Sequence, residues 1–174
     1  MEKTIYLDID LCVGCGACAV ACMDQNDIYP EKGQTAFRRI YQVEEGQFPA
    51  AGIMYFSAAC MHCEDAPCVM GCPTGAITKD GTTGVVGVHR ALCIGCHSCA
   101  MACPFGVPRY DSEEKMHKCN LCSGRVQAGL LPACVRVCPT SALSFESANR
   151  VQSGKEYRFA GNIVNAGHRA AVQK

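Results

Sequence analysis

Short apolar runs separated by polar turns set the first expectations for this chain. Ile77 and the Val-Val-Gly-Val run at residues 85–88 flank a polar, glycine-containing turn at residues 80–84, a pattern that predicts a β-hairpin. Ile-Tyr-Leu at residues 5–7 and Leu-Ser-Phe at residues 143–145 predict two further strands, which we expect to pair with each other. The pattern therefore indicates short strands and hairpins instead of one large sheet.

No uninterrupted apolar stretch approaches the ~20 residues that a membrane helix needs, so we expect no membrane span. The first nine residues, MEKTIYLDI, lack the apolar run and cleavage site of a secretory signal, and no twin-arginine leader precedes the first cysteine. We therefore expect a cytoplasmic location, where disulfides are rare.

Cysteine changes this picture most, because the 174 residues include sixteen of them. Such a share is typical of disulfide scaffolds or of small proteins packed around metal. Two groups read C-x2-C-x2-C-x3-C, and two have four or eleven residues before the third cysteine. In chain order the groups are Cys12, Cys15, Cys18, Cys22; Cys60, Cys63, Cys68, Cys72; Cys93, Cys96, Cys99, Cys103; and Cys119, Cys122, Cys134, Cys138.

The flanking residues repeat along with the cysteines. CVGCGACAVAC at residues 12–22 is close to CIGCHSCAMAC at residues 93–103, and CVMGCPTGAI at residues 68–77 parallels CVRVCPTSAL at residues 134–143. The alternating group types therefore indicate an internal duplication.

The spacing within a group suits a cubane cluster. Three closely spaced cysteines curl around one cube, whereas a fourth, one helical turn or ~6 Å further on, is aimed at a neighbouring cluster. Pro73, Pro104 and Pro139 follow three of the fourth cysteines and should end each helix there, whereas Met23 follows Cys22. The spacing therefore predicts four [4Fe-4S] clusters that exchange their fourth ligands between groups.

The hairpin at residues 77–88 joins groups two and three, so these two groups should form one module, and groups one and four should pair across it. We expect an α+β fold of two bacterial-ferredoxin-like modules, one inserted in the other, with few short helices and hairpins. The first module comprises residues 1–50 plus 105–145, the inserted one residues 51–104, and a C-terminal tail occupies residues 146–174.

Clusters would also change the charge of the protein. The formal net charge is zero at pH 7, but sixteen metal-bound thiolates around four oxidised clusters give about −8. Arg109, Lys115 and Lys118 are candidates for compensating this charge, and solvated surface cations are an equal alternative.

Zinc is the first rival, because C-x2-C pairs also form structural zinc sites, although zinc ribbons lack C-x3-C-P. Disulfides fit the triplets less well, since one thiol of each would stay unpaired. His62 and His97 are expected to line a cluster pocket or to donate to sulfur. No hydrolase, nucleotide-binding or zinc-protease motif is visible, so we expect no catalytic residue and no enzyme activity of the protein alone.

These motifs resemble the iron-sulfur subunits of molybdopterin oxidoreductases of the dimethyl sulfoxide reductase and formate dehydrogenase type. The resemblance spans residues 4–145 and rests on FRRIY at residues 37–41, CMHCEDAPC at 60–68, CIGCHSCAMACPFGVPRY at 93–110 and KCNLC at 118–122. It implies the following ligand sets: Cys12, Cys15, Cys18 with Cys138; Cys22 with Cys119, Cys122, Cys134; Cys60, Cys63, Cys68 with Cys103; and Cys72 with Cys93, Cys96, Cys99.

The resemblance also implies a direction. The Cys138 set would lie nearest a large molybdenum- or tungsten-pterin catalytic subunit, and the Cys72 set would lie at the far end, near a membrane quinone-linked subunit or a soluble carrier. Relatives that lack a cysteine at the position of Cys96 hold a three-iron cluster, so Cys96 implies four cubanes here. Export on a twin-arginine partner or peripheral attachment to a membrane complex is the alternative location. We expect no nucleic-acid partner.

A polyferredoxin that serves a hydrogenase, a carbon monoxide dehydrogenase or a tungsten aldehyde oxidoreductase is the alternative function. The excursion at residues 24–59 is a candidate docking surface and equally an ordinary surface loop. The tail at residues 146–174 is expected to lie along a partner or to be partly disordered.

Overall fold

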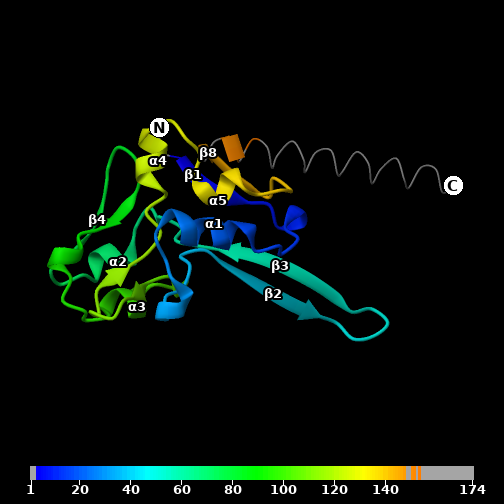
Figure 1. Cartoon of the computed structure of the whole chain (residues 1–174), viewed down its shortest axis with the longest axis horizontal. Helices are drawn as coiled ribbons and strands as arrows, with labels where there is room; N and C mark the ends of the chain where they lie inside the picture. The colour runs from blue at the N-terminus through cyan, green and yellow to red at the C-terminus, as the bar shows by residue number, and fades with distance from the viewer. Residues whose placement is uncertain (1–2, 148–149, 152, 154–174) are drawn as a thin grey trace.

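The computed structural model describes residues 3–147, 150, 151 and 153, and within them the fold is small and mixed α+β, as expected (Figure 1). The tail expected at residues 146–174 lies almost wholly outside this part. The strands are β1 (Lys3–Leu7), β2 (Arg39–Glu45), β3 (Gly52–Ala58), β4 (Ile77–Lys79), β5 (Val86–Val88), β6 (Arg109–Tyr110), β7 (Met116–His117) and β8 (Leu143–Ser147). The α-helices are α1 (Ala17–Gln25), α2 (Pro67–Met70), α3 (Ser98–Ala102), α4 (Ser123–Gln127) and α5 (Ala133–Arg136), with 3-10 turns at Ile9–Leu11, Pro30–Lys32 and Arg90–Leu92.

Both expected strand pairs are present and antiparallel. Strand β1 pairs with β8, so that Ile5 lies opposite Phe145 and Leu7 opposite Leu143. Strand β4 pairs with β5 around the turn that begins at Asp80, whose carboxylate accepts the backbone N–H of Thr83. Leu143 in the first pair and Ile77 and Val86 in the second are buried, which is how short alternating runs gain stability.

The sequence repeat is also a structural repeat. A 3-10 turn precedes the first cysteine of groups one and three, and a helix then begins after a residue in the left-handed region, Gly16 before α1 and His97 before α3. Helix α3 ends at Ala102, just before Cys103 and its proline, whereas α1 continues past Cys22 to Gln25. A Cys-Pro pair therefore follows α2, α3 and α5, which end before it, and is missing where α1 continues.

Strands β2 and β3 form a hairpin that sequence patterns did not single out within residues 24–59. Seven residue pairs run from Arg39 opposite Ala58 to Glu45 opposite Gly52, and the hairpin extends away from the helices (Figure 1). Phe48 lies in the loop that joins its two strands. Phe48 is 93% exposed. The excursion is therefore an ordered arm, and it crosses the module boundary expected at residue 50.

Two small cores contain cysteine side chains as members. One includes Ile77, Val86, Met116 and Cys99. The other joins Cys18 of α1 to Cys134 of α5 and Leu143 of β8, and α1 packs on α5. Sulfur atoms therefore occupy places that aliphatic side chains fill in most proteins, and the cysteines are held by packing from several elements.

Candidate metal centres

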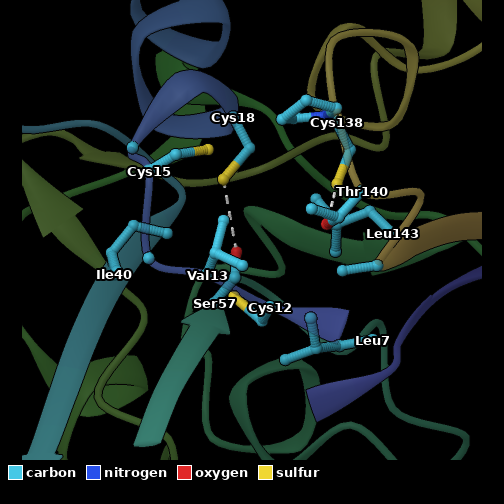
Figure 2. A pocket seen from close by; sticks show the side chains of 14 residues that line it. Leu7, Cys12, Val13, Cys15, Cys18, Ile40, Ser57, Cys138, Thr140 and Leu143 are labelled. Atoms are coloured by element: carbon cyan, nitrogen blue, oxygen red, sulfur yellow. Dashed lines mark hydrogen bonds between the residues drawn. The ribbon is translucent and has the colours of Figure 1, made fainter. Parts of the chain in front are cut away.

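Four cysteines from the two ends of the described chain line one cavity. Cys12, Cys15 and Cys18 come from the loop before α1 and its first turn, and Cys138 follows α5. Figure 2 shows Cys15 and Cys18 reaching in from one side and Cys138 from the other, with Ile40 among the apolar residues of the wall. The cavity measures about 320 Å³, including space open to solvent.

Two further cavities have the same character and similar size. One measures about 330 Å³ and the other about 380 Å³, again including open space. The cysteines that line the first are Cys72, Cys93, Cys96 and Cys99, and those that line the second are Cys60, Cys63, Cys68 and Cys103. In each cavity three cysteines of one group meet the fourth cysteine of another group.

Of the remaining four cysteines, Cys22 lies close enough to the other three to interact with them electrostatically. Burial raises the pKa of Cys22, and Cys134 and Cys122 add to this rise as neighbouring thiolates. Burial likewise raises the pKa of Cys119 to about 12, and Cys22 and Cys60 contribute. These thiols become anions only when a metal takes the place of the proton.

A repeated Cys-Pro-Thr motif stabilises two thiolates. Burial raises the pKa of Cys138, but hydrogen bonds from the backbone of Leu143 and the hydroxyl of Thr140 outweigh it and hold this pKa below its usual value. At Cys72 the same balance, with Thr74 in the place of Thr140, also lowers the pKa. Donors of this kind favour the charged form of sulfur, which is the form that binds metal.

Other polar groups contact cysteine sulfurs across the fold. The Ser57 hydroxyl lies 3.5 Å from Cys18 Sγ, and the Tyr110 hydroxyl lies 3.1 Å from Cys99 Sγ. Burial, followed by the hydrogen bond to Cys99, raises the pKa of Tyr110, so this hydroxyl keeps its proton. Because a metal-bound thiolate has no proton to give, Tyr110 is the donor of that pair.

The candidate histidines differ in their surroundings. His97 lines the 330 Å³ cavity, stacks on Tyr110 with ring centroids 3.8 Å apart, and its Nε2 lies 2.8 Å from a Glu114 carboxylate oxygen. His62 is not among the residues that line a described cavity; its Nδ1 accepts the backbone N–H of Val86 at 3.0 Å. Burial lowers the pKa of His62 to about 3, so this ring is neutral at physiological pH.

The three expected cations also differ. Lys118 is 6% exposed, lines the 380 Å³ cavity and donates to the carbonyl oxygens of Val86 and Cys119. Lys115 donates to the carbonyl oxygen of Cys93. Arg109 donates to two backbone carbonyl oxygens of its own loop. All three therefore bond to backbone oxygens, and Lys118 is the most deeply buried.

The donor sets fit iron-sulfur clusters. Each cavity offers four thiol groups, which as thiolates are the soft ligands that such clusters take. In the described part of the chain, no three His, Cys, Asp or Glu side chains converge tightly enough to hold a single ion. Twelve of the sixteen cysteines instead line three spaces of similar size with largely apolar walls, an arrangement that suits four-iron cubes.

Arg38, Ser57 and Tyr110 are polar residues at these sites that sequence reasoning did not single out. Arg38 is 4% exposed and donates to Ser57. Arg38 lies within the FRRIY motif at residues 37–41, but nothing in that motif assigned it a role beside the cysteines. Ser57 belongs to no motif, so no local signal pointed to it. The threonines of the repeated Cys-Pro-Thr motif, by contrast, could have been found from the repeat.

Comparisons with known proteins agree with this donor chemistry. The chain matches the family described as 4Fe-4S dicluster domain over residues 51–148, and a second family of the same description over residues 11–77. It is 40% identical over 158 residues to a chain of the anaerobic dimethyl sulfoxide reductase of Haemophilus influenzae, covering 85% of this chain and 75% of that protein. It is 39% identical over 163 residues to a subunit of the sulfite dehydrogenase of Allochromatium vinosum, covering 83% and 68%.

The chain is also 44% identical over 140 residues to protein NrfC of Escherichia coli, a match that covers 79% of this chain and 62% of NrfC. It therefore spans less than two thirds of that relative. Over the residues that the structure describes, no helix has the length and apolar character needed to cross a bilayer.

Proposed function

This protein belongs to the 4Fe-4S dicluster family, and we propose that it is the electron-transfer subunit of an oxidoreductase complex, with four [4Fe-4S] clusters and no catalytic residue of its own. Each cluster, when bound, supplies a one-electron redox couple. Two relatives are named as one component of a larger enzyme, the first of a reductase and the second of a dehydrogenase. These names support a subunit that serves a catalytic partner.

The observation that carries the proposal is the origin of the cysteines in each cavity. We assign Cys12, Cys15, Cys18 and Cys138 to cluster 1; Cys22, Cys119, Cys122 and Cys134 to cluster 2; Cys60, Cys63, Cys68 and Cys103 to cluster 3; and Cys72, Cys93, Cys96 and Cys99 to cluster 4. Three of these sets coincide with the three lined cavities. Cys22 supports the remaining set, because it lies close enough to Cys119, Cys122 and Cys134 to interact electrostatically with each of them.

We further propose the nested arrangement of modules, residues 51–104 inside residues 1–50 plus 105–145. Pairing of β1 with β8 and of β4 with β5 supports it, because each pair closes one module. The two cores support it as well, since the β8 core and the β4–β5 core share no buried member. Met116 is an exception in sequence, as it packs in the core of the inserted module.

The partner that we propose is a large molybdenum- or tungsten-pterin catalytic subunit on the side of cluster 1, with a second redox partner, a membrane quinone-linked subunit or a soluble carrier, beyond cluster 4. The β2–β3 hairpin is our candidate contact with the catalytic subunit. Its base contributes Ile40 and Ser57 to the cavity of cluster 1, and Phe48, Ile53 and Val43 are 93%, 58% and 43% exposed. An exposed apolar arm of this kind is typical of a protein-protein contact.

Metal analysis and co-purification test the proposal. The protein purified without oxygen should contain about sixteen iron atoms and as much acid-labile sulfide, and zinc in their place would refute the cluster assignment. Purification from the native source should yield a pterin-containing partner. A solitary protein that exchanges electrons with several enzymes would instead identify a polyferredoxin.

The hairpin contact has its own matched pair of variants. Phe48→Ser should weaken co-purification of the catalytic partner, whereas Met101→Ser, which alters an apolar side chain 82% exposed near cluster 4, should not. Equal losses in both variants would argue against the hairpin as the contact.

A further inference from the structure

Arg38 is a buried cation without a carboxylate partner. Arg38 directly precedes β2 and is 4% exposed. Its Nη1 donates to the carbonyl oxygen of Ser57 at 3.3 Å and to the hydroxyl oxygen of Ser57 at 3.1 Å. Its Nε has no hydrogen-bond partner, and no Asp or Glu of the described residues forms an ion pair with it. A guanidinium cannot lose its proton in a protein, so a charge buried in this way requires an anion nearby.

The anions near Arg38 are cysteine sulfurs from two proposed clusters. Burial raises the pKa of Cys18, a ligand of cluster 1, and of Cys119, a ligand of cluster 2, and the nearby Arg38 guanidinium opposes this rise in the pKa of both thiols. The backbone of Arg38 also donates a hydrogen bond that favours the thiolate of Cys22, a second ligand of cluster 2. With iron bound these sulfurs are permanent thiolates, so the charge of Arg38 lies near sulfurs of both proposed metal centres.

Ser57 connects this cation to one sulfur directly. Its hydroxyl oxygen accepts from Arg38 Nη1, which leaves the hydroxyl hydrogen free to donate to Cys18 Sγ, 3.5 Å away (Figure 2). A hydroxyl that accepts from a cation is a stronger donor, because hydrogen bonds in a chain polarise one another. The contact at Cys18 therefore carries part of the influence of Arg38.

Lys118, the other deeply buried cation near cysteines, gives a useful contrast. Its Nζ is bonded to two carbonyl oxygens, those of Val86 and Cys119. Backbone dipoles therefore satisfy much of its donor capacity. Arg38 has fewer such partners, and its unpaired Nε leaves the thiolates as its compensating charge.

We propose that Arg38 is the shared counter-charge of clusters 1 and 2 and raises the midpoint potentials of both. Reduction adds one negative charge to a cluster, and a buried cation stabilises that form more than the oxidised form. One side chain therefore raises the midpoint potentials of two clusters at once. The inference rests on the proposed function, since it assumes the four ligand sets.

The test is a redox titration of the full-length, iron-loaded protein, monitored by electron paramagnetic resonance, for the wild type and three variants. Arg38→Gln removes the charge and retains a donor to Ser57. We expect it to lower the reduction equilibrium constant of clusters 1 and 2 at least about tenfold, which is about 59 mV for one electron, and to leave clusters 3 and 4 unchanged. Arg38→Lys should keep most of the wild-type values. Arg39→Gln removes the neighbouring cation of β2 and should leave clusters 1 and 2 unchanged.

Iron content separates the possible failures. A wild-type protein without about sixteen iron atoms refutes the proposed function itself. A fully loaded Arg38→Gln protein with unchanged potentials overturns the role of Arg38 and leaves the proposed function intact. If Arg38→Gln fails to load, Arg38→Lys decides the matter: a loaded protein with near wild-type potentials supports the proposal, and a protein that also loses iron overturns it.

Ser57→Ala adds a readout that a merely structural role would not produce. It removes the hydroxyl beside Cys18 and retains the cation, so we expect a lower potential for cluster 1 alone. An equal change in cluster 2 would contradict the route through Ser57.

Discussion

The hydrogen bond between Tyr110 and Cys99 gives a sharp quantitative prediction for cluster 4. Tyr110→Phe removes one hydroxyl, which lies 3.1 Å from Cys99 Sγ, and retains the ring that stacks on His97 with an interplanar angle of 9°. The change therefore removes a donor to sulfur without removing the packing of the aromatic pair. We expect the midpoint potential of cluster 4 to fall.

The magnitude follows from the strength of the bond. A hydrogen bond to a charged group contributes about 1.5–3 kcal/mol, and only the part that grows when the sulfur gains negative charge affects the potential. If a third to a half of the bond grows in this way, the loss is ~0.5–1.5 kcal/mol. Since about 1.4 kcal/mol corresponds to ~59 mV for a one-electron couple, the potential should fall by ~20–60 mV.

A redox titration monitored by electron paramagnetic resonance measures this shift, with iron content as the check on cluster loading. Tyr41→Phe is the matched control, because Tyr41 lies on β2, is 43% exposed and packs on Phe56. An unchanged potential in Tyr110→Phe, or an equal shift in Tyr41→Phe, would refute the reasoning.

Three other predictions concern ligation, backbone strain and packing. Cys96→Ser should reduce cluster 4 to a three-iron form or remove it, while the active site of the partner still binds substrate; metal analysis and a substrate-binding assay check both parts. Gly14→Ala should lower iron content far more than Gly16→Ala, and equal losses would contradict this reasoning. Both positions have positive φ, but a Cβ at Gly14 would lie 2.3 Å from the Tyr55 ring, whereas a Cβ at Gly16 would meet nothing within 4 Å. Met116→Ala should destabilise the core by about 2–5 kcal/mol, because Met116 is 1% exposed. Cluster absorbance followed during heating measures this effect, and loss of absorbance at the same temperature as in the wild type would contradict the prediction.

Regular local patterns allowed much of the fold to be predicted. The strand pairs β1–β8 and β4–β5 followed from short apolar runs and one polar turn, and Pro104 marked the end of α3. The β2–β3 hairpin was not foreseen, because its apolar and polar residues do not alternate so as to give one buried apolar face. Both faces of this hairpin carry exposed apolar side chains, such as Val43 and Ile53, so binary patterning gave no signal.

The sequence by itself determined the chemistry of this protein, because a cysteine can reach only a nearby metal and its spacing limits which sulfurs share one. Sixteen cysteines in four groups therefore indicated the cluster type and the exchange between groups. The tertiary structure decided the surroundings of the sulfurs. Ser57 lies 39 residues from Cys18, and Tyr110 lies 11 residues from Cys99. Such contacts depend on how separate segments pack, which no local pattern encodes, and it is packing that brought the charge of Arg38 beside cysteines of two different groups.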